Sequence, residues 1–358
     1  FNQLQGHLDG VDQQAVSARA NLEAARTALA SGSPGRAASY LQSAHGLMGP
    51  ELLSSRPELA LDLYLLWIRV DTERGEIHTD RGPLSLALMD DLEPLDRVRL
   101  HLARVHQLLF NDDVEQSITL GLQGLADLGL ELPRDPRGWR RYAGARKAEV
   151  GRAMGRRSDE EILSASTLKD PVQLAHIKLL VALIPSAMVA GPDLQDLVIF
   201  EAAWIVLQGG ICDEAALALA HLAARMVQTE GYSEEARRYS SLALRLARQL
   251  NATTLQPEVM GYMGAFVTVW HRHPSEAAAQ TMTAHQGAMA LGDYTTALMV
   301  LVANITHRLY MGVELSQMAL EAEAALALSR RLRFGITTGA LIACTAYLDN
   351  LRGLTMAP

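Results

Sequence analysis

The chain has few of the residues that stabilise small secreted domains. Its 358 residues include only two cysteines, Cys212 and Cys344, which cannot form a disulfide framework or a cysteine-based zinc site. Two cysteines fit a reducing compartment, so we expect a cytoplasmic location. The first residues lack the basic start and apolar core of a secretory signal. Because the chain begins with Phe1, we expect it to be a piece of a longer protein.

Long hydrophobic runs are also missing. The longest apolar stretch without charge, 179–192, contains Pro185 and is too short to cross a bilayer, so we expect no membrane partner. Net charge is −8 and the isoelectric point is near 5.8. An acidic chain repels phosphates, which argues against direct nucleic-acid contact.

Catalytic signatures are absent from the sequence. There is no Gly-x4-Gly-Lys-Ser/Thr phosphate loop, no kinase motif and no Gly-x-Ser-x-Gly elbow. The histidine pairs His271/His273 and His101/His106 lack the spacing that places two ligands on one helix face. We therefore expect no enzyme activity, no catalytic residue, no metal and no cofactor. An enzyme with an unrecognised site remains the weakest of the alternatives.

Strand signals are missing too, and what is present is helical. Aromatic residues make up 5% of the chain, against 49% hydrophobic residues in all, so the apolar content is mostly Leu, Ala, Val and Met. Glycine, proline and aspartate clusters divide the helical periodicity into short segments. We expect helices at 12–31, 34–48, 57–76, 82–92, 94–110, 113–129, 137–155, 159–165, 171–190, 193–209, 213–230, 233–250, 255–272, 275–291, 294–311, 313–333 and 336–352.

Small residues recur at matching places in four of these segments. In each segment a small residue is followed by others at i+4 or i+7, and in three of them a Gly or Asp turn precedes it. The sets begin at Ala37, Ser117, Ala236 and Ala277. This spacing indicates close approach of two helices and resembles the tetratricopeptide repeat (TPR). We predict an all-α fold of antiparallel helix hairpins stacked as a TPR-like right-handed superhelical solenoid; the alternative is a generic Ala-rich bundle.

The repeat spacing divides the chain into three parts. We predict N-terminal TPR-like repeats over 1–133, a basic irregular helical connector over 134–170, where the spacing is lost, and C-terminal TPR-like repeats over 171–358.

A more specific resemblance begins in the middle of the chain. The segments that carry it are 111–118, 121–122, 128–133, 155–157, 160–163, 170–171, 177–180 and 184–185, followed later by 270–274, 292–294 and 309–312. Their succession resembles the helical region of large bacterial STAND-class signalling ATPases, over about residues 20–330. The maltose-type transcription activators are a more distant likeness. The resemblance implies that ATP binding and output belong to other parts of the polypeptide, which would be partners of this region.

A basic segment stands out against the acidic chain. Between Arg134 and Arg157, nine cations against two acids leave a charge of about +7. We predict a docking patch for an acidic partner at Arg137, Arg140, Arg141, Arg146, Arg156 and Arg157. The alternative is a solvated helix face, or one that packs on an acidic neighbour.

Aromatic residues gather in the later repeats. Tyr262, Phe266 and Trp270 are spaced by four, which predicts one stripe on a single helix. We predict that a ligand or partner groove includes Trp204, Tyr262, Phe266, Trp270, Arg272, Tyr294 and Tyr310. The alternative is that the stripe is the core face of its helix.

These features favour a non-catalytic sensor or scaffold module of a bacterial signalling or transcription-regulating ATPase. Its partners would be another protein or the flanking domains of the same polypeptide. The alternative is a small-molecule effector domain that controls an attached ATPase or DNA-binding output.

Overall fold

The computed structural model describes residues 10–74, 92–110, 113–332 and 334–355. These residues are almost wholly helical, and they contain no strand; an isolated bridge joins Thr167 and Ile211. The predicted all-α class is confirmed. The predicted helix at 82–92 lies almost entirely outside the described residues.

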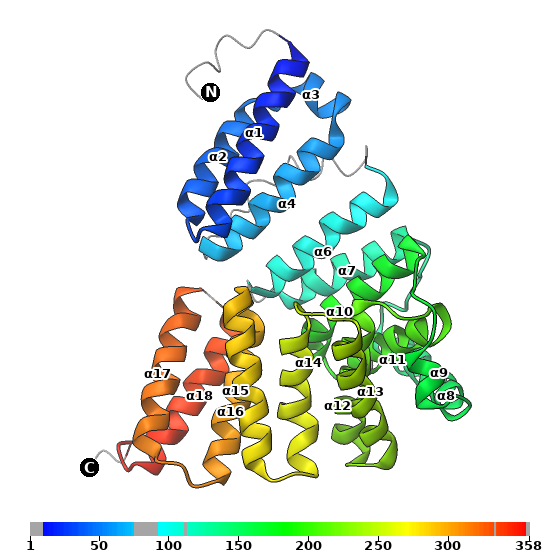
Figure 1. The fold of residues 1–358 in the computed structure, drawn as a ribbon, viewed down its shortest axis with the longest axis vertical. Helices are drawn as coiled ribbons and strands as arrows, with labels where there is room; N and C mark the ends of the chain where they lie inside the picture. Colours follow the sequence, from blue (N-terminus) through cyan, green and yellow to red (C-terminus); the bar gives the residue numbers. More distant parts are fainter. Residues whose placement is uncertain (1–9, 75–91, 111–112, 333, 356–358) are drawn as a thin grey trace.

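The N-terminal group comprises α1 (Val11–Ala30), α2 (Pro34–Gly46), α3 (Pro50–Ser55) and α4 (Pro57–Arg74). The short helix α3 was not predicted. These helices surround a core of their own, and in Figure 1 they lie together at one end of the molecule.

The central group follows. It comprises α6 (Pro94–Phe110), α7 (Val114–Asp127), α8 (Pro136–Gly155), α9 (Asp159–Leu163), α10 (Pro171–Ala190) and α11 (Pro192–Gly209). Many of these helices begin with proline, whose fixed φ suits the first helical position. One continuous core extends from Val98 on α6 to Val267, including residues of α8 and α9.

The C-terminal group comprises α12 (Asp213–Glu230), α13 (Glu234–Gln249), α14 (Gln256–Tyr262), α15 (Pro274–Leu291), α16 (Tyr294–Tyr310), α17 (Leu315–Arg331) and α18 (Gly335–Leu351). Figure 1 shows these helices side by side. One series of helices consists of α10, α12, α14, α16 and α18, and neighbours in this series contact each other. The helices α11, α13, α15 and α17 pack against this series. The helices therefore form two layers.

Small residues occupy the contacts between helices, as their spacing predicted. The residues at these positions are all buried, and all but Leu41 are small: Ala37, Leu41, Ala44, Ser117, Gly121, Gly124, Ala236, Ser240, Ala243, Ala277, Thr281 and Ala284. A Cβ on Gly121 of α7 would overlap the Leu183 side chain of α10. Because glycine has no side chain, α7 and α10 can pack closely at this point.

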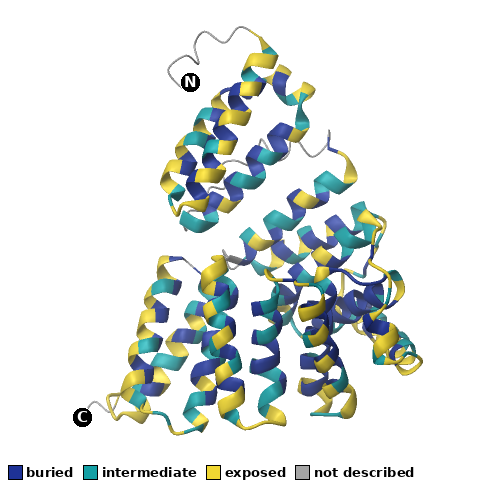
Figure 2. Ribbon diagram, in the orientation of Figure 1, coloured by how far each residue is buried: buried dark blue, intermediate teal, exposed yellow. Residues whose placement is uncertain are grey.

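By length and composition, α10 is the one described helix that could cross a membrane. Half of its apolar window is buried inside the protein, including Leu179 and Leu180. Figure 2 shows the same pattern across the fold, with buried residues concentrated where helices face each other.

Overpacking one helix contact tests this arrangement. Ala236 on α13 is fully buried, so Ala236→Leu should lower the free energy of unfolding by about 1–3 kcal/mol. The control is Ser241→Leu on the same helix, an exposed position where the change should stay within about 0.5 kcal/mol. Equal urea midpoints for the two variants would contradict the packing.

Candidate functional site

The basic segment forms α8, one of the longest described helices. The carboxylate of Asp135 accepts hydrogen bonds from the backbone N–H groups of Arg137 at 3.1 Å and Gly138 at 3.0 Å. Such a side chain satisfies donors that the first helical turn leaves free. Indole Nε1 of Trp139 donates to Pro133 O at 2.7 Å and closes the loop before the helix.

The inner side of α8 packs on α11 around a buried charge. Glu201 of α11 is 3% exposed, and its Oε2 accepts from Arg146 Nε at 2.6 Å and Tyr142 Oη at 3.0 Å. The guanidinium also lies over the Trp204 ring, 5.1 Å from its centroid. Burial raises the pKa of Glu201, and the nearby Arg146 opposes this shift. These contacts hold the two helices together.

Two other predicted docking residues have partners within the chain. Arg140 forms two hydrogen bonds with Asp193, at 3.1 and 2.9 Å. Arg157 donates to the backbone oxygen of Leu207. Arg140, Arg146 and Arg157 therefore already have partners within the chain, and an acidic docking partner would have to compete with these contacts.

The remaining cations form a separate set on the outer side of α8. Arg137, Arg141 and Arg156 are exposed, and so is Arg152, which was not predicted as part of the patch. None of their guanidinium groups forms an ion pair within the described parts of the chain. The segment thus has a paired inner side and an unpaired outer side.

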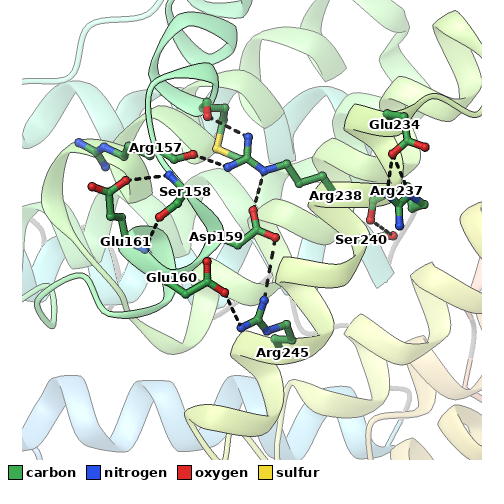
Figure 3. Close-up of polar contacts among 11 residues, drawn as sticks. Arg157, Ser158, Asp159, Glu160, Glu161, Glu234, Arg237, Arg238, Ser240 and Arg245 are labelled. Carbon is green, nitrogen blue, oxygen red and sulfur yellow. Dashed lines mark hydrogen bonds and ion pairs between the residues drawn. The ribbon is translucent and has the colours of Figure 1, made fainter.

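Figure 3 shows a polar cluster where the end of α8 meets α13. Arg238 donates to Asp159 Oδ1 at 2.6 Å, to Met154 O at 2.9 Å and to Arg157 O. Arg245 lies 3.9 Å from the same Asp159 carboxylate. Because Arg238 satisfies carbonyl groups at the end of α8, we assign the cluster to helix termination and packing.

A hollow of about 340 Å³ lies beside this cluster. Its lining residues are all polar: Asp159, Glu234, Glu235, Arg237, Arg238 and Ser241. Both arginines in the lining already bond carboxylates of the chain, Arg237 to Glu234 at 2.6 Å and Arg238 to Asp159. The hollow therefore offers no unpaired cation to an anionic ligand.

The predicted aromatic stripe is wrong as a single helix face. The α-helix ends at Tyr262 and continues as a π-helical turn, Met263–Val267, and a 3₁₀ turn, Thr268–Trp270. A π turn closes its hydrogen bonds at i+5, so a spacing of four no longer returns to one face. Tyr262 is buried with its ring 5.5 Å from that of Phe266, whereas Trp270 is 64% exposed.

The other predicted groove residues lie apart. Trp204 belongs to the α8–α11 contact, while Tyr294 and Tyr310 occupy the two ends of α16. At 1.5 Å per residue those ends are about 24 Å apart. Arg272 is exposed at the turn before α15. The seven residues therefore do not line one groove.

Exposure predicts the effect of truncating the stripe. Trp270→Ala should change the free energy of unfolding by less than about 1 kcal/mol, because the side chain is mostly in solvent. Tyr262→Ala should cost about 3 kcal/mol, because it empties a core position. Thermal or urea unfolding of both variants checks this; a larger loss in Trp270→Ala would show that the indole is packed.

A larger groove, of about 450 Å³, lies between α7, the start of α8 and the end of α10. Its walls are mainly apolar, with one acid and one cation: Val114, Glu115, Ile118, Thr119, Leu122, Arg134, Trp139 and Ala190. Sequence reasoning missed it. The residue in the sequence that could have pointed to this groove is Trp139, an aromatic side chain within the basic segment.

The described residues show no group of three or more His, Cys, Asp or Glu side chains placed to hold a metal ion. Cys212 is buried, and burial raises the pKa of its thiol to about 12, so it is not a thiolate at neutral pH.

No protein-family model matches the chain, and no curated protein sequence matches it. The features of the chain that bear on function are those of its own residues, above all the two sides of α8.

Proposed function

We propose that the chain is a non-catalytic helical-repeat module, folded as a TPR-like right-handed superhelix. It serves as a sensor or scaffold in a bacterial signalling or transcription-regulating ATPase, in the cytoplasm, through contacts with a protein or with flanking domains. The observation that carries the proposal is the two-layer array in which α10, α12, α14, α16 and α18 contact one another in sequence. Repeated helix pairs of this kind expose extended surfaces suited to protein binding.

Site-specific photo-crosslinking in the cells that make the protein tests this function. A photoreactive residue at Ala145 on α8 or at Leu320 on α17 samples two exposed regions far apart in the chain. We expect a discrete crosslinked protein at one of these positions, and no ATP hydrolysis by the purified chain. Hydrolysis that survives repurification and is abolished by one point substitution would reject the non-catalytic assignment.

A small-molecule effector remains the second candidate, and the groove of about 450 Å³ favours it. An effector would raise the melting temperature by mass action in a metabolite screen. The rise should disappear in Trp139→Ala, which opens the groove wall, while exposed Tyr310→Ala serves as the control. A protein scaffold would show no such response to any metabolite.

A further inference from the structure

The outer side of α8 carries small residues between its unpaired arginines. Gly144, Ala148 and Gly151 are exposed and lie on the same side of the helix as Arg141 and Arg152. Angular positions at 100° per residue place all five within about 100° of one another. We name the surface formed by Arg137, Arg141, Gly144, Ala148, Gly151, Arg152 and Arg156 the α8 outer face.

No contact with another described residue accounts for the two glycines of this face. A Cβ added at Gly144 or Gly151 would meet no atom within 4 Å, and neither residue has a positive φ. Glycine in a helix interior is less favourable than alanine, so these positions weaken α8 without any internal compensation. At Gly121 and Gly264, by contrast, a Cβ would meet a neighbouring helix at once. In those places the chain uses glycine for close approach of helices.

The arginines add a second and independent feature. Their side chains have no ion-pair partner among the described residues, while Arg140, Arg146 and Lys147 of the same helix pair with acids of α11 and α12. The unpaired arginines come in two i, i+4 pairs, Arg137/Arg141 and Arg152/Arg156. The smooth centre of the face therefore lies between two positive ends, about 16 Å apart from Arg141 to Arg152.

We propose that the α8 outer face docks an acidic helix of a protein partner. The partner helix lies along Gly144, Ala148 and Gly151 at close range, and carboxylates about three turns apart pair with the arginines at each end. This rests on the proposed scaffold function and names the partner's chemistry. The spacing of the two arginine pairs reads the same in both directions, so the face accepts either helix orientation.

Charge and shape both favour a helix over a nucleic acid. A phosphate backbone needs cations but gains nothing from glycines, and the net charge of −8 repels it. The exposed small residues give a rod-shaped partner the short interaxial distance that large side chains prevent.

A pair of helical peptides provides the probe. The acidic peptide is alanine-rich and carries glutamates with the spacing of Arg137, Arg141, Arg152 and Arg156; the control peptide carries glutamine at the same positions. Fluorescence anisotropy with the full chain should show binding of the acidic peptide, weakened at least about tenfold by the glutamine change and reduced by salt.

Matched variants locate the binding. Arg141→Glu combined with Arg152→Glu should weaken binding at least about tenfold, whereas Arg330→Glu with Arg331→Glu, the same charge change on exposed α17 residues, should stay within about twofold. Gly144→Leu with Ala148→Leu keeps all the cations and should also weaken binding at least about tenfold. Circular dichroism confirms that each variant folds; leucine at exposed helix positions favours helix formation.

Four results would overturn the proposal. The acidic peptide fails to bind at millimolar concentration; the leucine variant binds it as well as wild type; or a short DNA duplex binds more tightly than the peptide, which would make the face a general polyanion surface. A self-association lost in the arginine variant would identify a second copy as the occupant and also reject a separate partner. None of these outcomes decides the scaffold function itself, because the crosslinking test can still find a protein partner at α17.

Discussion

Replacing Glu201 by alanine is expected to destabilise the fold by about 3–5 kcal/mol, one of the largest losses from any single substitution in the chain. The carboxylate is 3% exposed and is the acceptor for both Arg146 and Tyr142. Its removal leaves Arg146 Nε and Tyr142 Oη without their acceptor at the contact that holds α8 on α11, and Glu149, at 2.5 Å, is then the one acid among the described residues still paired with the mostly buried guanidinium. Urea unfolding followed by circular dichroism measures the loss.

Two controls separate burial from charge. Asp193→Ala breaks the ion pair with exposed Arg140 on the same helix pair, and its urea midpoint should stay close to wild type because solvent screens that pair. Glu201→Gln should lose less than Glu201→Ala, since the amide oxygen still accepts a hydrogen bond. If Glu201→Ala and Asp193→Ala unfold at the same urea concentration, the buried pair contributes nothing special to stability.

Acid should destabilise the protein through His221. This residue of α12 is 3% exposed, and its ring lies 4.0 Å from that of Tyr262. Burial lowers the pKa of His221 to about 3, below the ordinary value of 6.5. Between these values the unfolded chain binds a proton that the folded chain excludes. The free energy of unfolding therefore falls as pH falls from 6.5 towards 3.

The variant His221→Leu removes this titrating ring, so its free energy of unfolding should fall less steeply as the pH falls below 6.5. Between pH 7 and pH 4, His221→Leu should lose about 3 kcal/mol less free energy of unfolding than the wild-type protein loses. Buried His101 and half-buried His176, whose pKa values burial also lowers, remain in both proteins and cancel in the comparison. Glu258, whose pKa burial raises to about 8, acts in the opposite direction and cancels as well.

The control is His271→Leu, the same change at an exposed histidine. If the two variants change the dependence of the urea midpoint on pH equally, the loss of a histidine in general, and not the burial of His221, accounts for the effect. If the urea midpoints of wild type and His221→Leu fall equally between pH 6.5 and pH 4, the His221 ring takes up its proton in the folded state.

Local pattern predicted the helices well because helical periodicity and capping depend on near neighbours. Asp113, Asp135, Asp170 and Ser233 each accept a backbone hydrogen bond at the start of a helix. The small-residue sets also follow from spacing, since residues that allow close approach recur on one side of a helix. The change to a π turn after Tyr262 could not be read this way. It occurs where Gly264 lies against Thr281 of α15, a contact between distant residues.

In the candidate site, too, one property follows from the sequence and another depends on distant contacts. Composition alone identified a basic segment, but nine similar cations gave no means of telling paired from unpaired ones. That distinction depends on Glu201, Asp193 and Glu230, which lie more than fifty residues away along the chain. Their carboxylates neutralise one side of α8 and leave the other side free.

By itself, the sequence determined that this protein is all-α, where most of its helices begin and end, and which small residues lie between them. These properties arise from backbone conformation and hydrogen bonds within a few residues. Only the tertiary structure decided that Trp270 is exposed while Tyr262 is buried, and that Gly144 and Gly151 of α8 face solvent. Exposure is set by which helices pack together, and packing is a relation between residues that the order of the chain does not state.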